Sequence, residues 1–121
     1  MDDQLRAAVD LFNDRRFAEF QDALEGMISA TRAASERQFY TLLDNLAEAM
    51  LQLSDGDVAD AEAMISGELR KIDEFVPRFR GLNVEALRDD FRRILMELRE
   101  TQAGRRMELA PSKLPRLRVL P

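Results

Sequence analysis

Residues 35–54 read SERQFYTLLDNLAEAMLQLS, and the pattern of this stretch implies contact with most of the chain. On a helix, at about 100° per residue, its apolar side chains cover an arc of roughly 200°, wider than the stripe that a surface helix usually buries. The apolar residues are Phe39, Tyr40, Leu42, Leu43, Leu46, Ala47, Ala49, Met50, Leu51 and Leu53. The remaining arc is a strip of uncharged and acidic groups at Thr41, Asp44, Asn45, Glu48 and Gln52. We therefore predict a central helix with one polar strip.

Apolar residues at intervals of three and four predict four further helices around this one. They cover approximately residues 2–13, 17–33, 58–76 and 83–100, joined by links of the short lengths usual in helical bundles. No segment before the tail is predicted to form a strand. The sequence thus predicts an all-α fold in one domain, a compact bundle of about five helices over residues 1–103. An extended tail over residues 104–121 follows it.

Several polar residues and one glycine mark the expected helix ends. Asp2 or Asp3 is expected to cap the first helix, and Asn83 the last. Ser35 and Gln38 have the spacing of a capping box at the start of the central helix. After that helix, Gly56 suits the left-handed residue that ends a helix, and Asp57 is expected to cap the next one.

The chain contains neither cysteine nor histidine. Without cysteine there is no disulfide, no thiolate nucleophile and no cysteine-bound zinc. Without histidine, the commonest general base and the commonest transition-metal ligand are missing. Most familiar catalytic arrangements are therefore excluded. We expect a protein without a cofactor, and a non-enzymatic role is favoured over an enzymatic one.

The net charge of −5 is unevenly distributed. After residue 100, five of the 18 basic residues stand against one of the 23 acidic residues, so the tail carries +4 and the body −9. An acidic body argues against nucleic acid as a partner. No apolar run is long enough to span a bilayer, and the N-terminus lacks the basic start and apolar stretch of a secretory signal. We expect a cytoplasmic protein without a membrane partner.

Three blocks of the sequence match a known pattern in order and spacing. They read AAVDLFNDRRFAEFQDALEGMI from residue 7, RQFYTLLDNLAEAMLQLSDGD from residue 37 and FVPRFRGLNVEALRDDFRRIL from residue 75. With these blocks the chain resembles a family of small all-helical prokaryotic proteins catalogued as domain of unknown function 309. The resemblance covers approximately residues 7–95 and implies the same helical fold.

The chain departs from that family at its polar positions. The family's His-Glu-x-x-Glu motif is represented by Gln21, Asp22 and Glu25, and on the central helix a Gln is Asn45 and a second His is Gln52. Glutamine keeps hydrogen-bonding capacity, but it cannot shuttle a proton near neutral pH and is a poor metal ligand. The resemblance therefore implies a member of the family in which the suspected active site is dismantled.

We expect these side chains to meet between the second and third predicted helices. Gln21 and Glu25, one turn apart, would face the strip on the central helix. The resulting polar seam is defined by Gln21, Asp22, Glu25, Asn45, Glu48 and Gln52. The first interpretation is a hydrogen-bonded edge of the core or a solvated face.

Two alternatives give the polar seam a function. Asp22, Glu25 and Glu48 are candidate ligands for a hard cation such as Mg²⁺, which prefers oxygen ligands, in a residual metal-dependent hydrolase. In the second alternative, the polar seam forms a pocket that binds a small ligand. Since burying two carboxylates together without a cation is costly, they would have to stay partly solvated or share a proton.

The tail ends in PSKLPRLRVLP, residues 111–121, where three prolines and alternating apolar and basic residues favour an extended conformation. The predicted contact residues are Leu114, Arg116, Leu117, Arg118, Val119 and Leu120. They either fold back over a groove of the same molecule or bind a partner, including a second copy of the chain. The expected function is a non-catalytic interaction or assembly domain, binding a protein partner or itself through the tail and the outer helix faces.

Overall fold

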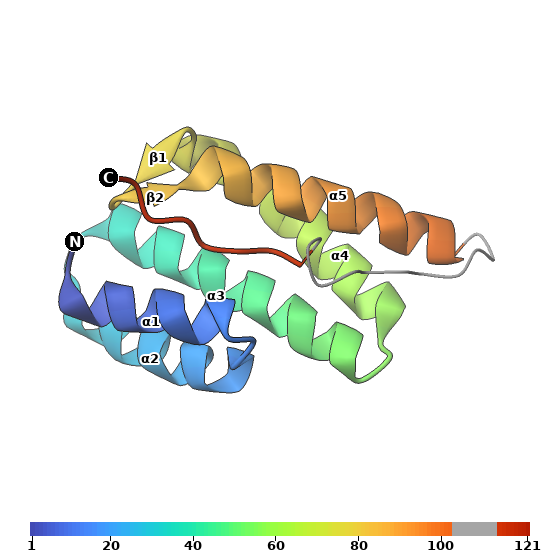
Figure 1. The fold of residues 1–121 in the computed structure, drawn as a ribbon, viewed down its shortest axis with the longest axis horizontal. Coiled ribbons are helices and arrows are strands. Elements are labelled where there is room, and N and C mark those ends of the chain that lie inside the picture. Colours follow the sequence, from blue (N-terminus) through green and yellow to red (C-terminus); the bar gives the residue numbers. More distant parts are fainter. Residues whose placement is uncertain (103–113) are drawn as a thin grey trace.

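The computed structural model describes residues 1–102 and 114–121, and it confirms the all-α fold as a compact helical bundle (Figure 1). Its helices are α1 (Asp3–Asn13), α2 (Phe17–Ala30), α3 (Ala34–Ser54), α4 (Val58–Leu69) and α5 (Val84–Gln102). Between α4 and α5 lie the 3-10 helix η1 (Ile72–Phe75) and two short antiparallel strands, β1 (Arg78–Phe79) and β2 (Leu82–Asn83). The boundary predicted between bundle and tail, at residues 103 and 104, falls at the edge of the segment outside this description.

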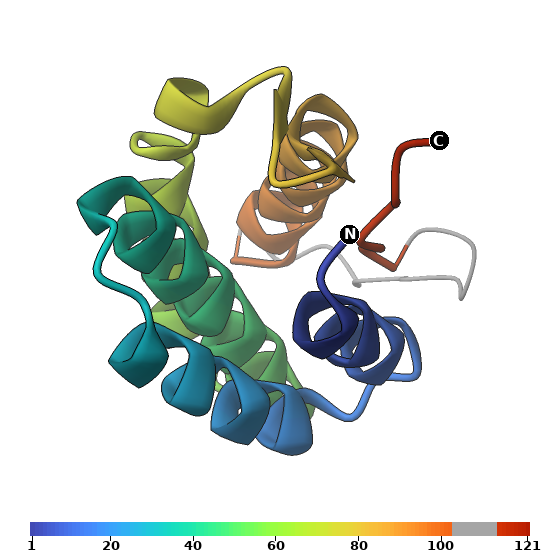
Figure 2. The same cartoon turned by 90° about the vertical axis from the view of Figure 1, so that its left-hand side faces the viewer.

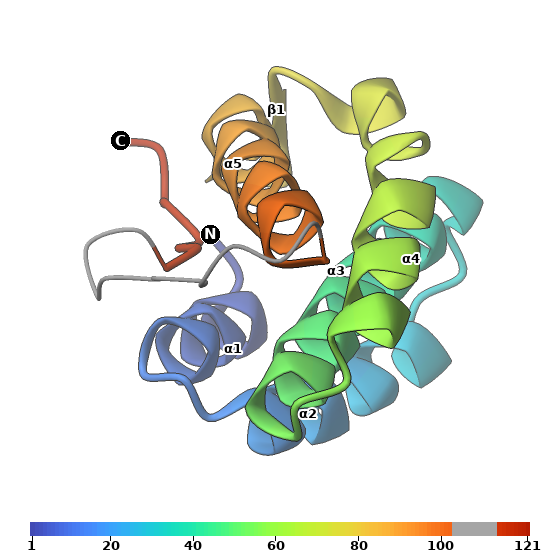
Figure 3. The same cartoon turned by 90° about the vertical axis from the view of Figure 1, so that its right-hand side faces the viewer.

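Each helix packs against the next one in the sequence, with α3 between α2 and α4 (Figures 2 and 3). Seen end on, the five helices follow one another around a common core, and residues 114–121 lie on the side where α1 and α5 come together. The central position of α3 is as predicted. Its buried residues are Phe39, Tyr40, Leu42, Leu43, Leu46, Ala47, Ala49 and Met50. In the residues that the structure describes, no helix is long and apolar enough to cross a membrane.

Three of the predicted helix ends are confirmed. Asp2 caps α1, because its side chain accepts a hydrogen bond from the backbone N–H of Gln4 at 2.8 Å. Asn83 caps α5 by accepting from the N–H of Ala86 at 2.9 Å. Gly56 follows α3 with φ of +82°, in the left-handed region where glycine avoids the steric cost of a Cβ.

Two predicted caps are wrong. No capping box forms at Ser35, since α3 begins one residue earlier, at Ala34, and its first turn has no side-chain cap. Thr31 organises this turn instead: its hydroxyl accepts from the N–H of Ala33 at 3.3 Å and donates to Glu36 at 2.9 Å. Asp57 precedes α4 as expected, but its side chain makes no capping hydrogen bond.

The predicted helix over residues 58–76 is too long, and the prediction of no strand before the tail is wrong. The α-helix ends at Leu69 and the 3-10 helix η1 follows. Pro77 explains why helical geometry stops after Phe75, because it lacks an N–H and forces Val76, the residue before it, into an extended conformation. The turn between β1 and β2 places Arg80 at φ +51° and Gly81 at φ +79°. Two left-handed residues are typical of a tight hairpin, but Arg-Gly is not one of the pairs that signal it in a sequence.

Aromatic packing fixes this hairpin against the central helix. The ring of Phe79 lies 4.8 Å from that of Phe39 on α3 and 5.0 Å from that of Phe75 in η1. Phe39 and Phe75 are themselves 5.2 Å apart, centroid to centroid. Such ring pairs add about 0.5–1.5 kcal/mol each beyond the burial of apolar area. These contacts pack the hairpin onto the bundle and leave one of its edges to pair with another segment.

Two glycine substitutions separate backbone strain from helix propensity. Gly81→Ala should lower the free energy of unfolding by about 1–2 kcal/mol, because φ is +79° and an added Cβ would lie 3.2 Å from the Cε of Met1. Gly67→Ala, inside α4 with open space around the new methyl, should raise that free energy by roughly 0.5–1 kcal/mol. Urea unfolding followed by circular dichroism measures both. A Gly81→Ala protein as stable as the wild type would contradict the hairpin geometry.

Candidate functional site

The polar seam forms in part between α2 and α3. The side-chain amide of Gln21 donates to the Glu48 carboxylate and to the backbone carbonyl of Asp44, both at 3.4 Å. These bonds are long and therefore weak. The prediction that Gln21 faces Glu48 is confirmed, and the contact is a partly buried hydrogen-bonded edge.

Asn45 does not belong to this seam, so that part of the prediction is wrong. Its side chain points to α4 and donates to the Glu68 carboxylate at 3.0 Å. Adjacent residues on a helix are about 100° apart, so the strip on α3 divides: Asp44 and Glu48 lie towards α2 and Asn45 towards α4. Gln52 is half-buried at the last turn of α3, and its side-chain oxygen has no hydrogen-bond partner among the described residues.

Asp44 joins the seam in place of Asn45. It lines a hollow together with Gln21, Asp22 and Glu25, and its Oδ1 is buried without a hydrogen-bond partner in the described structure. Burial raises the pKa of Asp44 above its ordinary value, and the nearby charges of Glu48 and Glu25 raise it further, while the Gln21 amide acts in the opposite direction. The seam therefore carries one carboxyl group with a raised affinity for protons.

The seam does not assemble a metal site within residues 1–102 and 114–121. No group of three or more carboxylates there is arranged to hold a metal ion. Of the three candidate ligands, Asp22 and Glu25 line the hollow, while Glu48 takes its hydrogen bond from Gln21. The arrangement can hold a proton on Asp44, but it offers no convergent ligand set and no base with an established partner.

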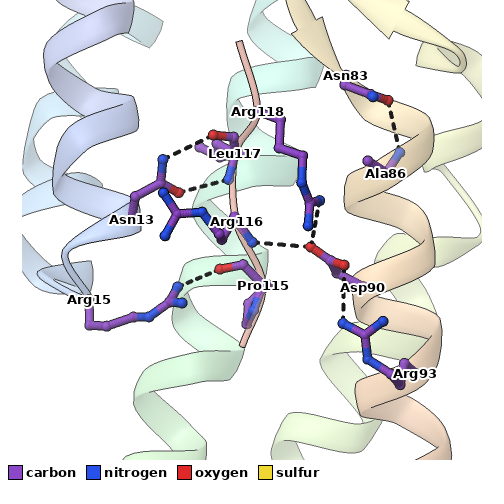
Figure 4. Close-up of polar contacts among 10 residues, drawn as sticks. All are labelled: Asn13, Arg15, Asn83, Ala86, Asp90, Arg93, Pro115, Arg116, Leu117 and Arg118. Atoms are coloured by element: carbon purple, nitrogen blue, oxygen red, sulfur yellow. Dashed lines mark hydrogen bonds and ion pairs between the residues drawn. The ribbon is translucent and has the colours of Figure 1, made fainter. Parts of the chain in front are cut away.

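A second polar site joins α1 to residues 114–121, here called the C-terminal segment (Figure 4). The side-chain amide of Asn13 donates to the Leu117 carbonyl at 3.0 Å, and its oxygen accepts from the Leu117 N–H at 2.8 Å. One side chain thus satisfies both backbone groups of a residue, as a neighbouring strand would. Leu117 is buried, with 3% of its surface exposed.

The opposite side of the segment is held by Asp90 on α5, which is 4% exposed. Its Oδ2 accepts from the backbone N–H of Arg116 at 3.2 Å and from the Arg118 guanidinium at 3.0 Å. Its Oδ1 accepts from Arg93 at 3.1 Å. A buried carboxylate requires such donors, because an unpaired charge in the interior is costly.

Backbone contacts at both ends complete the docking. The Arg15 guanidinium donates to the Pro115 carbonyl, and the pKa of Arg15 is lowered by burial and by the charge of Arg116, with Asp90 opposing this. At the hairpin, the Asn83 N–H donates to the Arg118 carbonyl at 2.9 Å. The Leu120 N–H donates to the Gly81 carbonyl at 2.8 Å, so the segment extends the hairpin edge by one bridge.

The self-packing alternative for the tail is therefore the one seen in this structure. Of the six predicted contact residues, Leu117 is buried, Leu114 and Leu120 are half-buried, and Arg116, Arg118 and Val119 remain exposed. The part of the tail over residues 104–113 lies outside the described residues.

Sequence reasoning missed the residues that receive the segment, Asn13 and Asp90, as well as Glu68. A signal was present for both carboxylates. Asp90 lies three residues after Leu87 and four before Ile94, and Glu68 has the same relation to Ile65 and Ile72. A charged residue inside an apolar helical stripe is the pattern that reveals them. Asn13 gave no such signal, because a polar residue at the end of a helix is also what a simple helix end would have.

Comparison of the chain with known protein families, with curated proteins and with solved structures found no match. The resemblance to domain of unknown function 309 therefore stays a prediction.

Replacing Asp44 tests the proton affinity of the seam. Because the pKa is raised, folding favours the protonated carboxyl, and the stability gained by protonation is lost as the pH rises through the folded-state pKa. Asp44→Asn, which resembles the protonated form, should raise the melting temperature by a few degrees at neutral pH. The gain should shrink to nothing below the ordinary aspartate pKa of 3.8.

Thermal unfolding monitored by circular dichroism across this pH range measures the difference. Asp22→Asn is the matched control, since Asp22 lines the same hollow but is exposed, whereas Asp44 is half-buried with its Oδ1 fully buried. A gain in the Asp44→Asn protein that is independent of pH would contradict the assignment.

Proposed function

We propose that this protein is a non-catalytic interaction domain that binds an extended chain segment between α1 and α5. In the structure, the bound segment is the protein's own C-terminal segment. In an assembly, the same position would be filled by the C-terminal segment of a second copy, or by a segment of similar chemistry from a protein partner. The observation that carries the proposal is the paired hydrogen bonding of Leu117 to Asn13. It recognises the backbone of an extended chain, as strand addition does, while the apolar position of Leu117 selects its side chain.

The charges support a basic segment with apolar residues at alternate positions. The body of the protein is acidic, and the buried Asp90 carboxylate accepts from the Arg118 guanidinium and from the backbone N–H of Arg116. Charge complementarity of this kind fixes the register and suppresses wrong partners more than it adds affinity. The preferred ligand is thus an extended segment with Leu at the buried position and Arg directly after it.

Exchange between copies requires no new contacts. The receiving residues lie on α1, α5 and the hairpin, and every contact described for the segment would form equally with a segment from another molecule. At low concentration the segment of the same chain is favoured, because its tether gives it a high effective concentration. Higher protein concentration should favour exchange and hence assembly.

A full-length variant whose own C-terminal segment cannot dock, here called the receiver, tests whether the position between α1 and α5 binds a segment from another molecule. Leu117→Asp places a charge in the buried position and should release the segment. This variant should then bind a synthetic peptide of residues 114–121 saturably, as measured by fluorescence anisotropy. The wild-type protein should bind the peptide more weakly, because its groove is filled.

Two further changes make the result specific. Asp90→Asn in the receiver should weaken peptide binding by about tenfold or more, the loss expected when a buried hydrogen-bonded charge is removed. Val119→Asp, at a position 39% exposed, is the matched control for Leu117→Asp and should leave the segment docked. A Leu117→Asp protein that keeps its helical circular dichroism signal yet binds no wild-type peptide would refute the proposal.

A further inference from the structure

A groove lies between α3 and α4, on the opposite side of the central helix from the polar seam. Its volume is about 320 Å³, and it is lined by one face of the first three turns of α3 and by Glu68 and Lys71. The lining residues on α3 are Ala34, Arg37, Gln38, Thr41, Leu42 and Asn45. A hollow of about 240 Å³ adjoins it, sharing Gln38, Leu42 and Lys71 and adding Glu74 and Phe75. Small-molecule sites begin at roughly this size.

At one end of the groove is Glu68, whose side chain is 6% exposed. Its Oε1 accepts from Asn45 at 3.0 Å and from the Lys71 ammonium at 3.4 Å. Both donors reach the same oxygen, and the described part of the chain supplies none to Oε2. Unlike the fully buried oxygens of Asp44 and Gln52, Oε2 is accessible to solvent, so a ligand that enters the groove can donate to it.

At the other end is Arg37, an exposed residue whose guanidinium forms no ion pair with a carboxylate in the described residues. The planar guanidinium suits a carboxylate, which it can bind through two parallel hydrogen bonds. Arg37 and Glu68 thus line one groove with opposite charges and do not pair with each other.

The positions of Arg37 and Asn45 along α3 indicate the length of the ligand. Asn45 donates a hydrogen bond to Glu68. Arg37 is eight positions before Asn45, which is about 12 Å along the helix axis. Leu42 lies between them in the sequence and lines both hollows. Two opposite charges with an apolar wall between them fit a molecule whose own charges are separated by an aliphatic or peptide spacer.

We propose that this groove binds a small zwitterion whose ammonium group donates to Glu68 Oε2 and whose carboxylate is bound by Arg37. Its spacer of several atoms lies against Leu42. Either an ω-amino acid or a short peptide with free ends meets these requirements. An α-amino acid is too short to reach both charges. The site is independent of the docking of the C-terminal segment.

The probe for the test is ε-aminocaproate, titrated into the isotope-labelled full-length protein and followed by amide chemical shifts. Saturable shifts should appear around Asn45 and Lys71. Glycine, hexylamine and hexanoate should bind about tenfold more weakly or not at all, because each lacks the length or one of the two charges. A dipeptide with free ends, compared with ε-aminocaproate, distinguishes a peptide ligand from an ω-amino acid.

Variants assign the two charges. Arg37→Met and Glu68→Gln should each weaken binding of ε-aminocaproate about tenfold, and Arg37→Met, at an exposed position, should leave the fold intact. Arg70→Met is the matched control, since Arg70 is exposed at the end of α4 and does not line the groove. The absence of saturable shifts at millimolar ligand would overturn the proposal, as would equal binding by a folded Arg37→Met protein.

Discussion

Asp90 is a carboxylate on the inward face of α5, and its need for hydrogen-bond donors links the last helix to the C-terminal segment. With 4% of its surface exposed, it cannot be satisfied by solvent to the extent a surface aspartate is. Two of its three donors come from Arg116 and Arg118, residues that approach from outside the helical body. Leaving a buried acceptor without one of its donors commonly costs about 1–3 kcal/mol. The side of the bundle where α1 and α5 come together therefore depends on a polar contact, whereas its other interfaces depend on apolar packing.

The helices were predictable where apolar periodicity was long and uninterrupted. The wide arc of α3 and the stripes of α1 and α5 gave their positions, because burial of such stripes decides the fold and the period of a helix is fixed. The stretch after α4 was not predictable from period alone. There the apolar residues Ile72 and Phe75 continue the stripe in sequence, but they lie in a 3-10 helix. Pro77 then ends helical geometry, and the chain turns into the hairpin.

The candidate site was predictable only to the level of a helix face. The prediction that Gln21 and Glu48 lie together is correct. The same prediction wrongly included Asn45, which is one position after Asp44 on α3 and is therefore turned by about 100° towards α4. That distinction depends on where two neighbouring helices sit around α3, which no local pattern specifies. The docking of the tail also depends on tertiary contact: its extended form could be read from its prolines, but the amide of Asn13 that receives it could not.

The pairing of Asn13 with Leu117 joins residues 104 positions apart in the chain. The most extensive helix–helix contacts are between helices adjacent in sequence, which form with little loss of loop entropy. During synthesis, α1 to α4 have their neighbours available as soon as they emerge, and only α1 must wait for a partner from the far end of the chain. The contact that closes the fold is thus the last to become possible, and until then the polar face of α1 is open to whatever extended chain is nearby.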